Sequence, residues 1–298
     1  MSFIKFSKAS LVLSAILVLA SIGLLVYPGP KLSIEFTGGT LMELEGTTAA
    51  ELESTVRALP WEGEQLRSAD LSVTRTGSVF LRMPTLTNEE HLQLLGALKE
   101  KHPEIEELQF TTIGPTVGAG LKRRALWALA VASVAIVVYL AAAFRKVPRE
   151  LSPWSFGLAA VAALFHDLLI TVGIFVILSH VTSFQFDTLF VSALLSIMGY
   201  SVSDTIVIFD RIRENLYLEG KRESLSELAD RSLKQTLSRT ISTGVATMIM
   251  LLALFLFGAE SIRWFMLALI VGTIIGTYSS FFVATPLIVY LRKDIRRR

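Results

Sequence analysis

Six long stretches that are almost free of charge constrain this chain more than any other feature. A helix that crosses a lipid bilayer needs about 20 mostly apolar residues, at 1.5 Å per residue over a hydrocarbon core of roughly 30 Å. Six segments meet this requirement, at about residues 11–27, 125–144, 156–179, 188–209, 240–257 and 264–291. The sequence therefore predicts an α-helical polytopic membrane protein with six transmembrane helices.

The overall composition agrees with that interpretation and excludes several classes of function. Hydrophobic residues make up 52% of the chain and charged residues 18%, whereas soluble proteins carry about 25% charged residues. The net charge of +2 gives no indication of a nucleic-acid partner. Cysteine is absent, so disulfides and thiol catalysis are excluded, and the four histidines show no metal-ligand spacing. We expect neither a cofactor nor a metal ion, and we do not expect an enzyme.

The first apolar segment could be mistaken for a secretory signal, because Lys5 and Lys8 precede it. Its apolar run is longer than a usual signal core, and it ends at Tyr27-Pro28-Gly29-Pro30 without a convincing cleavage site of small residues. We interpret residues 1–30 as a short cytoplasmic terminus followed by an uncleaved first transmembrane helix.

The distribution of Lys and Arg predicts the orientation of the chain. With the N-terminus inside, the cytoplasmic segments hold seventeen of these residues, and the short outside loops hold one, Arg263. Both termini are then cytoplasmic and residues 31–124 are external. The remaining part, residues 125–298, forms a five-helix core with a cytoplasmic loop at 210–239 and a basic C-terminal tail.

The external segment has the pattern of one small α+β domain. Capping boxes at Thr48–Glu51 and Thr87–Glu90 predict the starts of two helices. Alternating apolar residues predict an extended segment at 34–45, broken by Gly38-Gly39, and strands at 71–75, 79–83 and 105–111. The resulting β-α-β-β-α-β order is that of a ferredoxin-like domain. No catalytic constellation is present, which favours a binding or docking module over an external enzyme.

Asp204 interrupts the fourth apolar segment and is the main candidate for a functional group. A charged side chain at mid-helix costs about 2.5–3.5 kcal/mol on insertion scales. Asp204 precedes Arg211 by seven residues, which places it roughly 10 Å from the cytoplasmic side. The carboxyl group either loads and releases protons or hydrogen-bonds neighbouring helices. Because intramembrane acids are functional by default, the first interpretation is favoured, and the neighbouring Ser203 and Thr205 are secondary polar candidates.

Three further ionisable sites are open to two interpretations each. The adjacent His166 and Asp167, near the middle of the third segment, either relay protons or form a satisfied polar contact. Asp210 immediately precedes Arg211, which favours an interfacial salt bridge. Arg239 opens the fifth segment on the cytoplasmic side. It acts either as a counter-ion of Asp204 or as a positive flank that contacts lipid phosphates. An arginine cannot realistically lose its proton, so it would tune the carboxylate rather than carry the proton.

Two patterns concern helix packing. Gly272 and Gly276 form a GxxxG pattern in the sixth segment, which allows close approach of another helix. Residues 224–238 open with a Ser224–Glu227 capping pair and place four leucines on one face. This pattern predicts an amphipathic helix that lies on the membrane surface.

Several of these residues stand in motifs that resemble the SecF family, which comprises accessory subunits of the bacterial protein translocase. The fourth segment and its exit, at 199–205 and 209–215, resemble the most specific motif of the family. Residues 34–40, 113–118, 237–240 and 276–280 resemble its other motifs in the same order. Ser33, Glu35 and Ser203 stand where the family usually has Gly, Asp and often Asn.

The resemblance implies a membrane core similar to that of the resistance-nodulation-division superfamily and a location in the bacterial inner membrane. It implies SecD as the partner, forming the second of two pseudosymmetric six-helix halves. Together they would use the proton gradient to pull unfolded preprotein outward from the SecYEG channel, within membrane lipid. Asp204 matches the proton-pathway Asp of the family and Arg239 its associated Arg. No such role is carried over to His166 or Asp167.

Two alternatives remain. The chain could be a scaffold subunit that conducts no protons, or half of a small-molecule proton antiporter. The antiporters of the superfamily generally carry twelve spans and two large external domains in one chain, whereas this chain has six and one. That difference argues against the second alternative, and a six-span half with a polar seam expects a partner.

Overall fold

The computed structural model describes residues 3–58, 69–74, 76–145, 153–219 and 223–295. Several basic residues used for the orientation lie outside these ranges, namely Lys146, Arg149, Lys221, Arg222, Arg296, Arg297 and Arg298. The chain divides into two compact units. One comprises residues 1–29, 128–177 and 189–298, and the other comprises residues 30–127 and 178–188.

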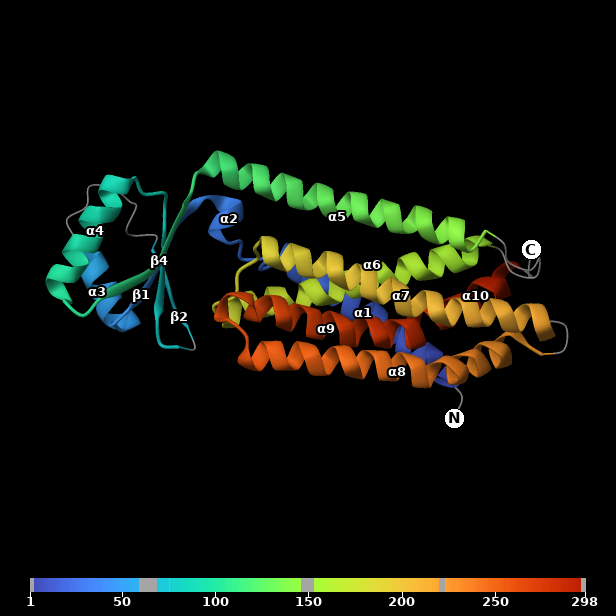
Figure 1. Ribbon diagram of the computed structural model, residues 1–298. Coiled ribbons are helices and arrows are strands. Elements are labelled where there is room, and N and C mark those ends of the chain that lie inside the picture. The colour runs from blue at the N-terminus through green and yellow to red at the C-terminus, as the bar shows by residue number, and fades with distance from the viewer. Residues whose placement is uncertain (1–2, 59–68, 75, 146–152, 220–222, 296–298) are drawn as a thin grey trace. The chain divides into compact units, whose positions relative to one another are not determined.

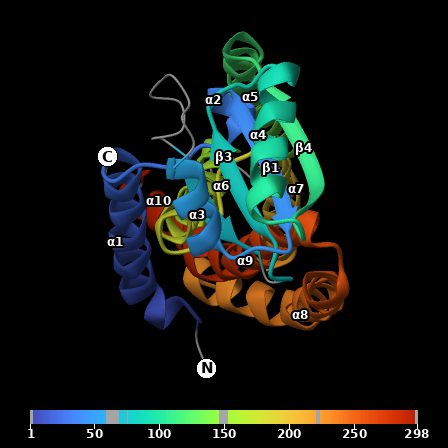
Figure 2. The ribbon, with the colours of Figure 1, turned by 90° about the vertical axis from the view of Figure 1, so that its left-hand side faces the viewer.

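The second unit contains an antiparallel sheet of strands β1 (Gly39–Glu45), β2 (Asp70–Val73), β3 (Val79–Met83) and β4 (Glu106–Ile113), in the order β2-β3-β1-β4. Helices α3 (Ala49–Ala58) and α4 (Asn88–Lys101) lie over one face of the sheet (Figure 2). The core between sheet and helices includes Met42, Leu44, Leu81, Leu94 and Leu98, each fully buried. The predicted β-α-β-β-α-β order is therefore present.

The capping residues act as the sequence indicates. Thr87 accepts a hydrogen bond from the backbone nitrogen of Glu90, and the Glu90 carboxylate accepts one from the backbone nitrogen of Thr87. The same reciprocal pair joins Thr48 and Glu51 at the start of α3. Each box satisfies amide groups that have no partner inside the helix, so the two helix starts are confirmed.

The predicted extended segment at 34–45 is wrong over its first four residues. Ile34–Thr37 form one helical turn, α2, and the strand begins at Gly39. The hydroxyl of Ser33 accepts a hydrogen bond from the backbone nitrogen of Glu35, which caps this turn. The apolar alternation that predicted a strand places Phe36 in the interior, where it is 7% exposed.

Within the described residues, six helical segments are long and apolar enough to cross a membrane, in agreement with the prediction (Figure 1). They are α1 (Ser7–Val26), α5 (Pro115–Ala143), α6 (Pro153–Val181), α7 (Thr188–Glu219), α8 (Leu225–Phe257), and α9 (Arg263–Ser279) continued by α10 (Thr285–Ile295). The short 3-10 helices Phe3–Phe6 and Glu260–Ile262 precede α1 and α9. Between α9 and α10, Ser280–Ala284 form a π-helical turn.

Several of these helices extend beyond the predicted apolar segments. Helix α5 begins at Pro115, inside the segment predicted as external, because proline suits the first helical position. The segment 210–239, predicted as a cytoplasmic loop, is largely helical where the structure describes it. Helix α7 continues to Glu219, and α8 begins at Leu225 behind the confirmed Ser224–Glu227 capping box.

The predicted surface helix at 224–238 is also wrong in its environment. It is the first part of α8, and its leucines contact the protein interior instead of the membrane surface. Leu228 and Leu233 are fully buried in a cluster with Phe209 and Ile212 of α7. An apolar stripe shows only that one face of a helix is covered, and here the cover is protein.

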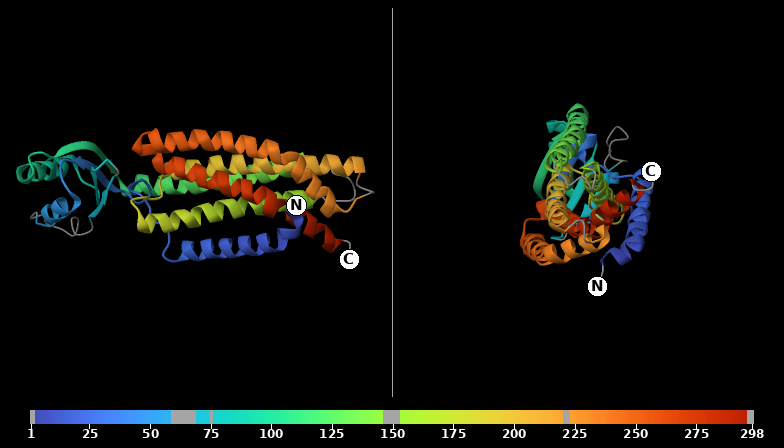
Figure 3. Two further views of the ribbon diagram at one scale, coloured as in Figure 1. Left: turned by 90° about the horizontal axis from the view of Figure 1, so that it is seen from below. Right: turned by 90° about the vertical axis from the view of Figure 1, so that its right-hand side faces the viewer.

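Small polar residues hold α1 against the sixth helical segment. Ser7, Ser14 and Ser21 recur every seven residues and are the buried residues of α1. The hydroxyl of Ser10 donates to the carbonyl oxygen of Phe282 at 3.0 Å. Figure 3 shows α1 at the edge of the helical bundle. Short side chains allow close helix approach in a lipid environment, where interhelical hydrogen bonds supplement packing.

Candidate functional site

The site in the helical bundle lies where α7 and α9 approach each other closely. A Cβ atom added to Gly272 would lie 2.3 Å from side-chain atoms of Ile197, and one added to Gly276 would lie 3.2 Å from the Cβ of Ser201. The two glycines therefore face α7, and the GxxxG pattern has the packing geometry expected of it. This close approach places Ser201 beside the C-terminal part of α9.

Asp167 of α6 is fully buried and makes the most hydrogen bonds of the candidate groups. Its Oδ2 accepts a bond of 2.5 Å from the Ser201 hydroxyl and one of 2.7 Å from the Ser279 hydroxyl. Its Oδ1 lies 2.9 Å from Nδ1 of His166, which is 5% exposed. The carboxylate thus joins α6, α7 and α9 at one point.

Asp204 lies one turn beyond Ser201 on α7 and has different surroundings. It is 8% exposed, and its Oδ2 has no hydrogen-bond partner. Thr277 of α9 faces both Asp204 and Tyr200. Gly244 of α8 approaches Tyr200, since a Cβ added to this glycine would lie 3.4 Å from the Tyr200 hydroxyl oxygen. Three helices therefore contribute to the surroundings of Asp204.

Arg239 of α8 is near enough for its charge to act on Asp204, but its side chain is exposed. Within the described ranges no ion pair joins the two residues. The next residue, Thr240, is buried, and its hydroxyl has no partner. The arginine thus acts on the carboxylate through its charge and not through a direct ion pair.

The remaining candidates separate into buried and exposed groups. The Thr205 hydroxyl is buried and lies 2.9 Å from that of Ser280. Ser203 is exposed and points away from this seam. Asp210 forms an ion pair, as expected for the edge of the span, but its partner is Arg213 instead of the adjacent Arg211. Residues one turn apart share a helix face, whereas adjacent residues do not.

Unpartnered polar atoms are concentrated around these carboxylates. In the described part of the chain, buried atoms without a hydrogen-bond partner include His166 Nε2, the Thr171 and Tyr200 hydroxyls, Asp204 Oδ2 and the Thr240 hydroxyl. Buried polar atoms are almost always satisfied by protein or by ordered water. These atoms lie on α6, α7 and α8.

Sequence reasoning missed the partners of Asp167. Ser201 and Ser279 stood in motifs already singled out, but nothing in the sequence connected them with a residue of α6. Tyr200, Thr277 and Gly244 were equally unassigned. A polar residue within each of three apolar segments was the available signal, and it does not specify which residues share a helix interface.

In the other unit, the glycine motif at 38–39 allows backbones to pass closely. Gly38 has φ +78° and Gly39 has φ +136°, both in the region that favours glycine. A Cβ added to Gly38 would lie 2.8 Å from the Cα of Pro115, and one added to Gly118 would lie 2.7 Å from the backbone nitrogen of Gly38. The motifs at 34–40 and 113–118 therefore meet where β1 begins and α5 starts.

Glu35 connects this same segment to the start of α7. Its Oε2 accepts hydrogen bonds from the backbone nitrogen of Thr188 at 2.8 Å and from the Thr188 hydroxyl at 2.6 Å. Beside it, the backbone nitrogen of Ser33 donates to the carbonyl of Phe186, and that of Phe186 donates to the carbonyl of Lys31. A carboxylate at a helix N-terminus is stabilised by free amides and by the helix dipole.

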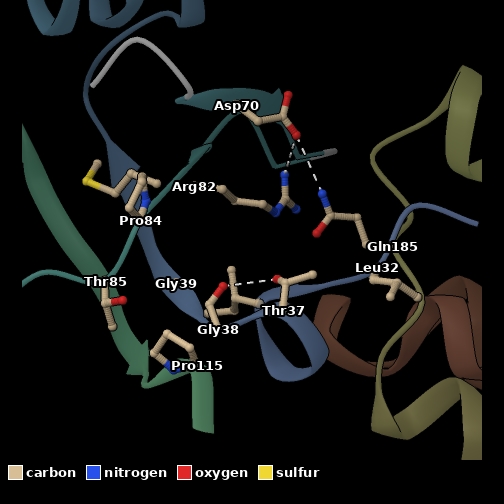
Figure 4. Close-up of a pocket in the computed structure, with 12 residues that line it drawn as sticks. Leu32, Thr37, Gly38, Gly39, Asp70, Arg82, Pro84, Thr85, Pro115 and Gln185 are labelled. Atoms are coloured by element: carbon tan, nitrogen blue, oxygen red, sulfur yellow. Dashed lines mark hydrogen bonds and ion pairs between the residues drawn. The ribbon is translucent and has the colours of Figure 1, made fainter. Parts of the chain in front are cut away.

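An open pocket of about 390 Å³ lies next to the glycine motif. Figure 4 shows Arg82 and Gln185 both directed at the carboxylate of Asp70 on its rim. The distances to Asp70 Oδ2 are 3.8 Å from Arg82 and 3.5 Å from Gln185. Pro84, Thr85 and Pro115 complete the wall. Among the described residues, those of this pocket included, no cluster of three His, Cys, Asp or Glu side chains could hold a metal ion.

Two family profiles match the sequence. The profile described as "Protein export membrane protein SecD/SecF, C-terminal" matches residues 93–294, and the "SecD/SecF GG Motif" matches residues 24–50. The second match covers Glu35 and the two glycines at the start of β1. The first covers both buried carboxylates and Arg239.

Curated relatives match over nearly the whole chain. The protein translocase subunit SecF of Thermobaculum terrenum is 38% identical over 99% of this chain and 95% of its own length. The subunit of the same name from Haemophilus influenzae is 36% identical over 95% of this chain and 83% of its own.

Two solved structures share the fold. The crystal structure of SecDF, a translocon-associated membrane protein from Thermus thermophilus, aligns with 98% of this chain at a TM-score of 0.86 and 31% identity. SecDF in the super-membrane-facing form aligns at a TM-score of 0.68 and 32% identity. In each case this chain spans 39% of the longer chain.

Proposed function

Because the chain belongs to the SecF family of protein translocase subunits, we propose that it uses the proton gradient to promote export of polypeptides, with Asp204 as the proton carrier. One observation carries this proposal most directly. Asp204 is buried among apolar helices, yet its Oδ2 has no hydrogen-bond partner. A buried carboxylate without a full set of donors is costly when ionised, so its protonation depends on what approaches it.

Arg239 supplies the approaching charge in this mechanism. A cation near a carboxylate favours the ionised form, and its withdrawal favours the protonated form. The proposal is supported by the exposure of the Arg239 side chain and by its electrostatic action on Asp204. Proton uptake then takes place with Arg239 withdrawn, and release with Arg239 close. The arginine itself stays charged throughout.

The partners follow from the family and from the longer relatives. The aligned crystal structure is of SecDF, in which this chain matches 39% of the residues. We propose that a SecD chain supplies the second half of the membrane core, and that the assembly acts on unfolded preprotein beside the SecYEG channel in the bacterial inner membrane. Such a subunit transports protons and moves polypeptide and carries out no covalent chemistry.

The test is a substitution of Asp204 in vesicles that contain the assembled complex and an imposed proton gradient. Asp204→Asn removes the titratable group and is expected to abolish gradient-dependent export while assembly is preserved. Ser203→Ala, next to it on the exposed side of α7, is the matched control and should retain export. Unchanged export with Asp204→Asn would exclude the carrier role and favour the scaffold alternative. Arg239→Met should likewise impair export, through loss of the tuning charge.

The proposed orientation has its own test, made simple by the absence of cysteine. A single cysteine is introduced at the exposed Gln93 of α4 or at the exposed Tyr217 of α7. A membrane-impermeant maleimide added to intact cells is expected to label the Gln93→Cys variant and to leave the Tyr217→Cys variant unlabelled. The reverse pattern would place residues 31–124 in the cytoplasm.

A further inference from the structure

We infer that Asp167 is a second proton-binding carboxylate, in series with Asp204, and that the Ser201 hydroxyl relays protons between them. The inference rests on the proposed function, and it assigns a role to a group that the proposed mechanism does not use. The contact between Asp167 and Ser201, 2.5 Å from Oδ2 to Oγ, connects α6 to the helix that carries Asp204.

Because Asp167 is buried, a negative charge on its carboxylate has to be compensated by a nearby positive charge or removed by a proton. The residue is fully buried, and isolated charges are costly away from water. Its hydrogen-bond partners are two serine hydroxyls and one imidazole. Among the described ion pairs, His166 is its basic partner. A proton on the carboxyl group would remove the cost of a buried charge, and we infer that Asp167 binds one.

The Ser201 hydroxyl can transmit that proton because it both donates and accepts. When Asp167 is ionised, Ser201 donates to Oδ2, as the structure has it. When Asp167 is protonated, its O–H donates to the Ser201 oxygen, and the serine hydrogen turns toward Asp204. The serine hydrogen passes to Asp204 across a bridging water, and the Asp167 proton passes to Ser201. One proton moves in total. The serine ends neutral, Asp167 ionised and Asp204 protonated.

The spacing along α7 permits this transfer. Ser201 and Asp204 are three residues apart, so they share one helix face with Cβ atoms about 5–6 Å from each other. Asp204 Oδ2 is buried without a partner, and the Thr277 side chain of α9 lies within hydrogen-bonding reach of both Asp204 and Tyr200. The unpartnered oxygen is a site where a water molecule gains a hydrogen bond.

Further unpartnered atoms continue the path on the other side of the contact. The Thr171 hydroxyl lies one turn beyond Asp167 on α6, toward the connection to α7, and has no partner. His166 Nε2 is also buried and unpartnered. Because α6 and α7 run in opposite directions, Thr171 and Asp204 lie on opposite sides of the Asp167–Ser201 contact. The polar atoms thus form a series across the bundle, with Asp167 between its two halves.

The two serines that contact Asp167 provide a matched pair of variants. Both hydroxyls donate to Oδ2, and both residues are buried. Only Ser201 also lies one turn from Asp204 on the same helix. Ser201→Ala and Ser279→Ala each remove one donor from Asp167, but only the first removes the relay. A purely structural role predicts equal effects for the two, whereas the relay predicts a much larger effect for Ser201.

The measurement is proton influx into vesicles that hold the full chain assembled with its partner, followed by a pH-sensitive dye. We expect Ser201→Ala to slow influx by about a hundredfold, the scale on which positioned proton-transfer groups act. Ser279→Ala should slow it far less, and Asp167→Asn should abolish it. Equal rates for the two serine variants, or wild-type influx with Asp167→Asn, would overturn the inference.

A spectroscopic measurement keeps the inference separate from the proposed function. Infrared difference spectra of the purified complex across a pH titration report protonated carboxyl groups. Asp167→Asn is expected to remove one buried-carboxyl band that Asp204→Asn retains. If Asp204→Asn blocks influx while Asp167→Asn does not, the second site is excluded and the carrier role of Asp204 stands. If neither substitution alters influx, the proposed function itself fails. Should Asp167→Asn not assemble, the comparison of the two serine variants still decides.

Discussion

Removal of the Glu35 carboxylate is expected to open the start of α7 selectively. The carboxylate accepts two hydrogen bonds from Thr188, at 2.8 and 2.6 Å. A hydrogen bond to a charged group contributes about 1.5–3 kcal/mol, and a carboxylate at a helix N-terminus adds about 0.3–1 kcal/mol. Because water replaces part of these interactions at a half-buried site, we expect Glu35→Ala to lower the free energy of local opening by about 2–3 kcal/mol.

The assay is hydrogen–deuterium exchange of the purified protein, read at the first turn of α7. At 1.4 kcal/mol for each factor of ten, the loss corresponds to exchange roughly thirtyfold to a hundredfold faster. Glu35→Gln keeps an acceptor without the charge and should give a smaller increase. Glu45→Ala, an exposed carboxylate on β1, is the control and should leave this turn unchanged. Wild-type protection in Glu35→Ala would refute the assignment of Glu35 as the cap of α7.

Four other predictions concern packing, capping and acid dependence. Gly118→Ala brings a Cβ to 2.7 Å from a backbone nitrogen and should destabilise the unit that contains the sheet by about 1–3 kcal/mol in chemical denaturation. Gly120→Ala, with open space around it, should be neutral or slightly stabilising. Gly276→Val should separate α7 from α9 and lower the thermal midpoint of the solubilised protein. Thr87→Ala should lower the free energy of unfolding by about 1 kcal/mol. The backbone and side-chain hydrogen bonds from Thr87 hold the pKa of Glu90 below its ordinary value of 4.5. The stability that Glu90 contributes is therefore complete at pH values above 4.5. It is lost as the pH falls through the lowered pKa of the folded state. Glu90→Gln should remove this acid dependence in denaturation curves measured at several pH values.

The features that sequence could predict are those set within a few residues. The capping boxes at Thr48, Thr87 and Ser224 each depend on a partner three residues later, and all three are present. The six apolar segments likewise depend on local composition. The surface helix at 224–238 failed because periodicity identifies an apolar face but not what covers it. Its Leu228 and Leu233 pack inside the bundle.

The site was predictable as a set of residue types and not as a set of contacts. Asp167 was identified as an ionisable group in an apolar helix, but its partners come from 34 and 112 positions later in the chain. Which serines face it depends on the rotation of α7 and α9 about their axes, and that rotation is fixed by Gly272 and Gly276. A turn of either helix by one residue would direct a different side chain at the carboxylate.

The two buried carboxylates differ in how completely they are hydrogen-bonded, and this difference bears on the roles proposed for them. Asp167 has a partner on both oxygens, from side chains that are themselves buried. Asp204 has an unpartnered oxygen and is influenced by an exposed arginine. Arg239 therefore bears on the surroundings of Asp204, whereas the hydrogen-bond partners of Asp167 are two serines and a histidine. This difference is consistent with the proposal that Asp204 loads and releases the proton, and with the inference that Asp167 passes it on.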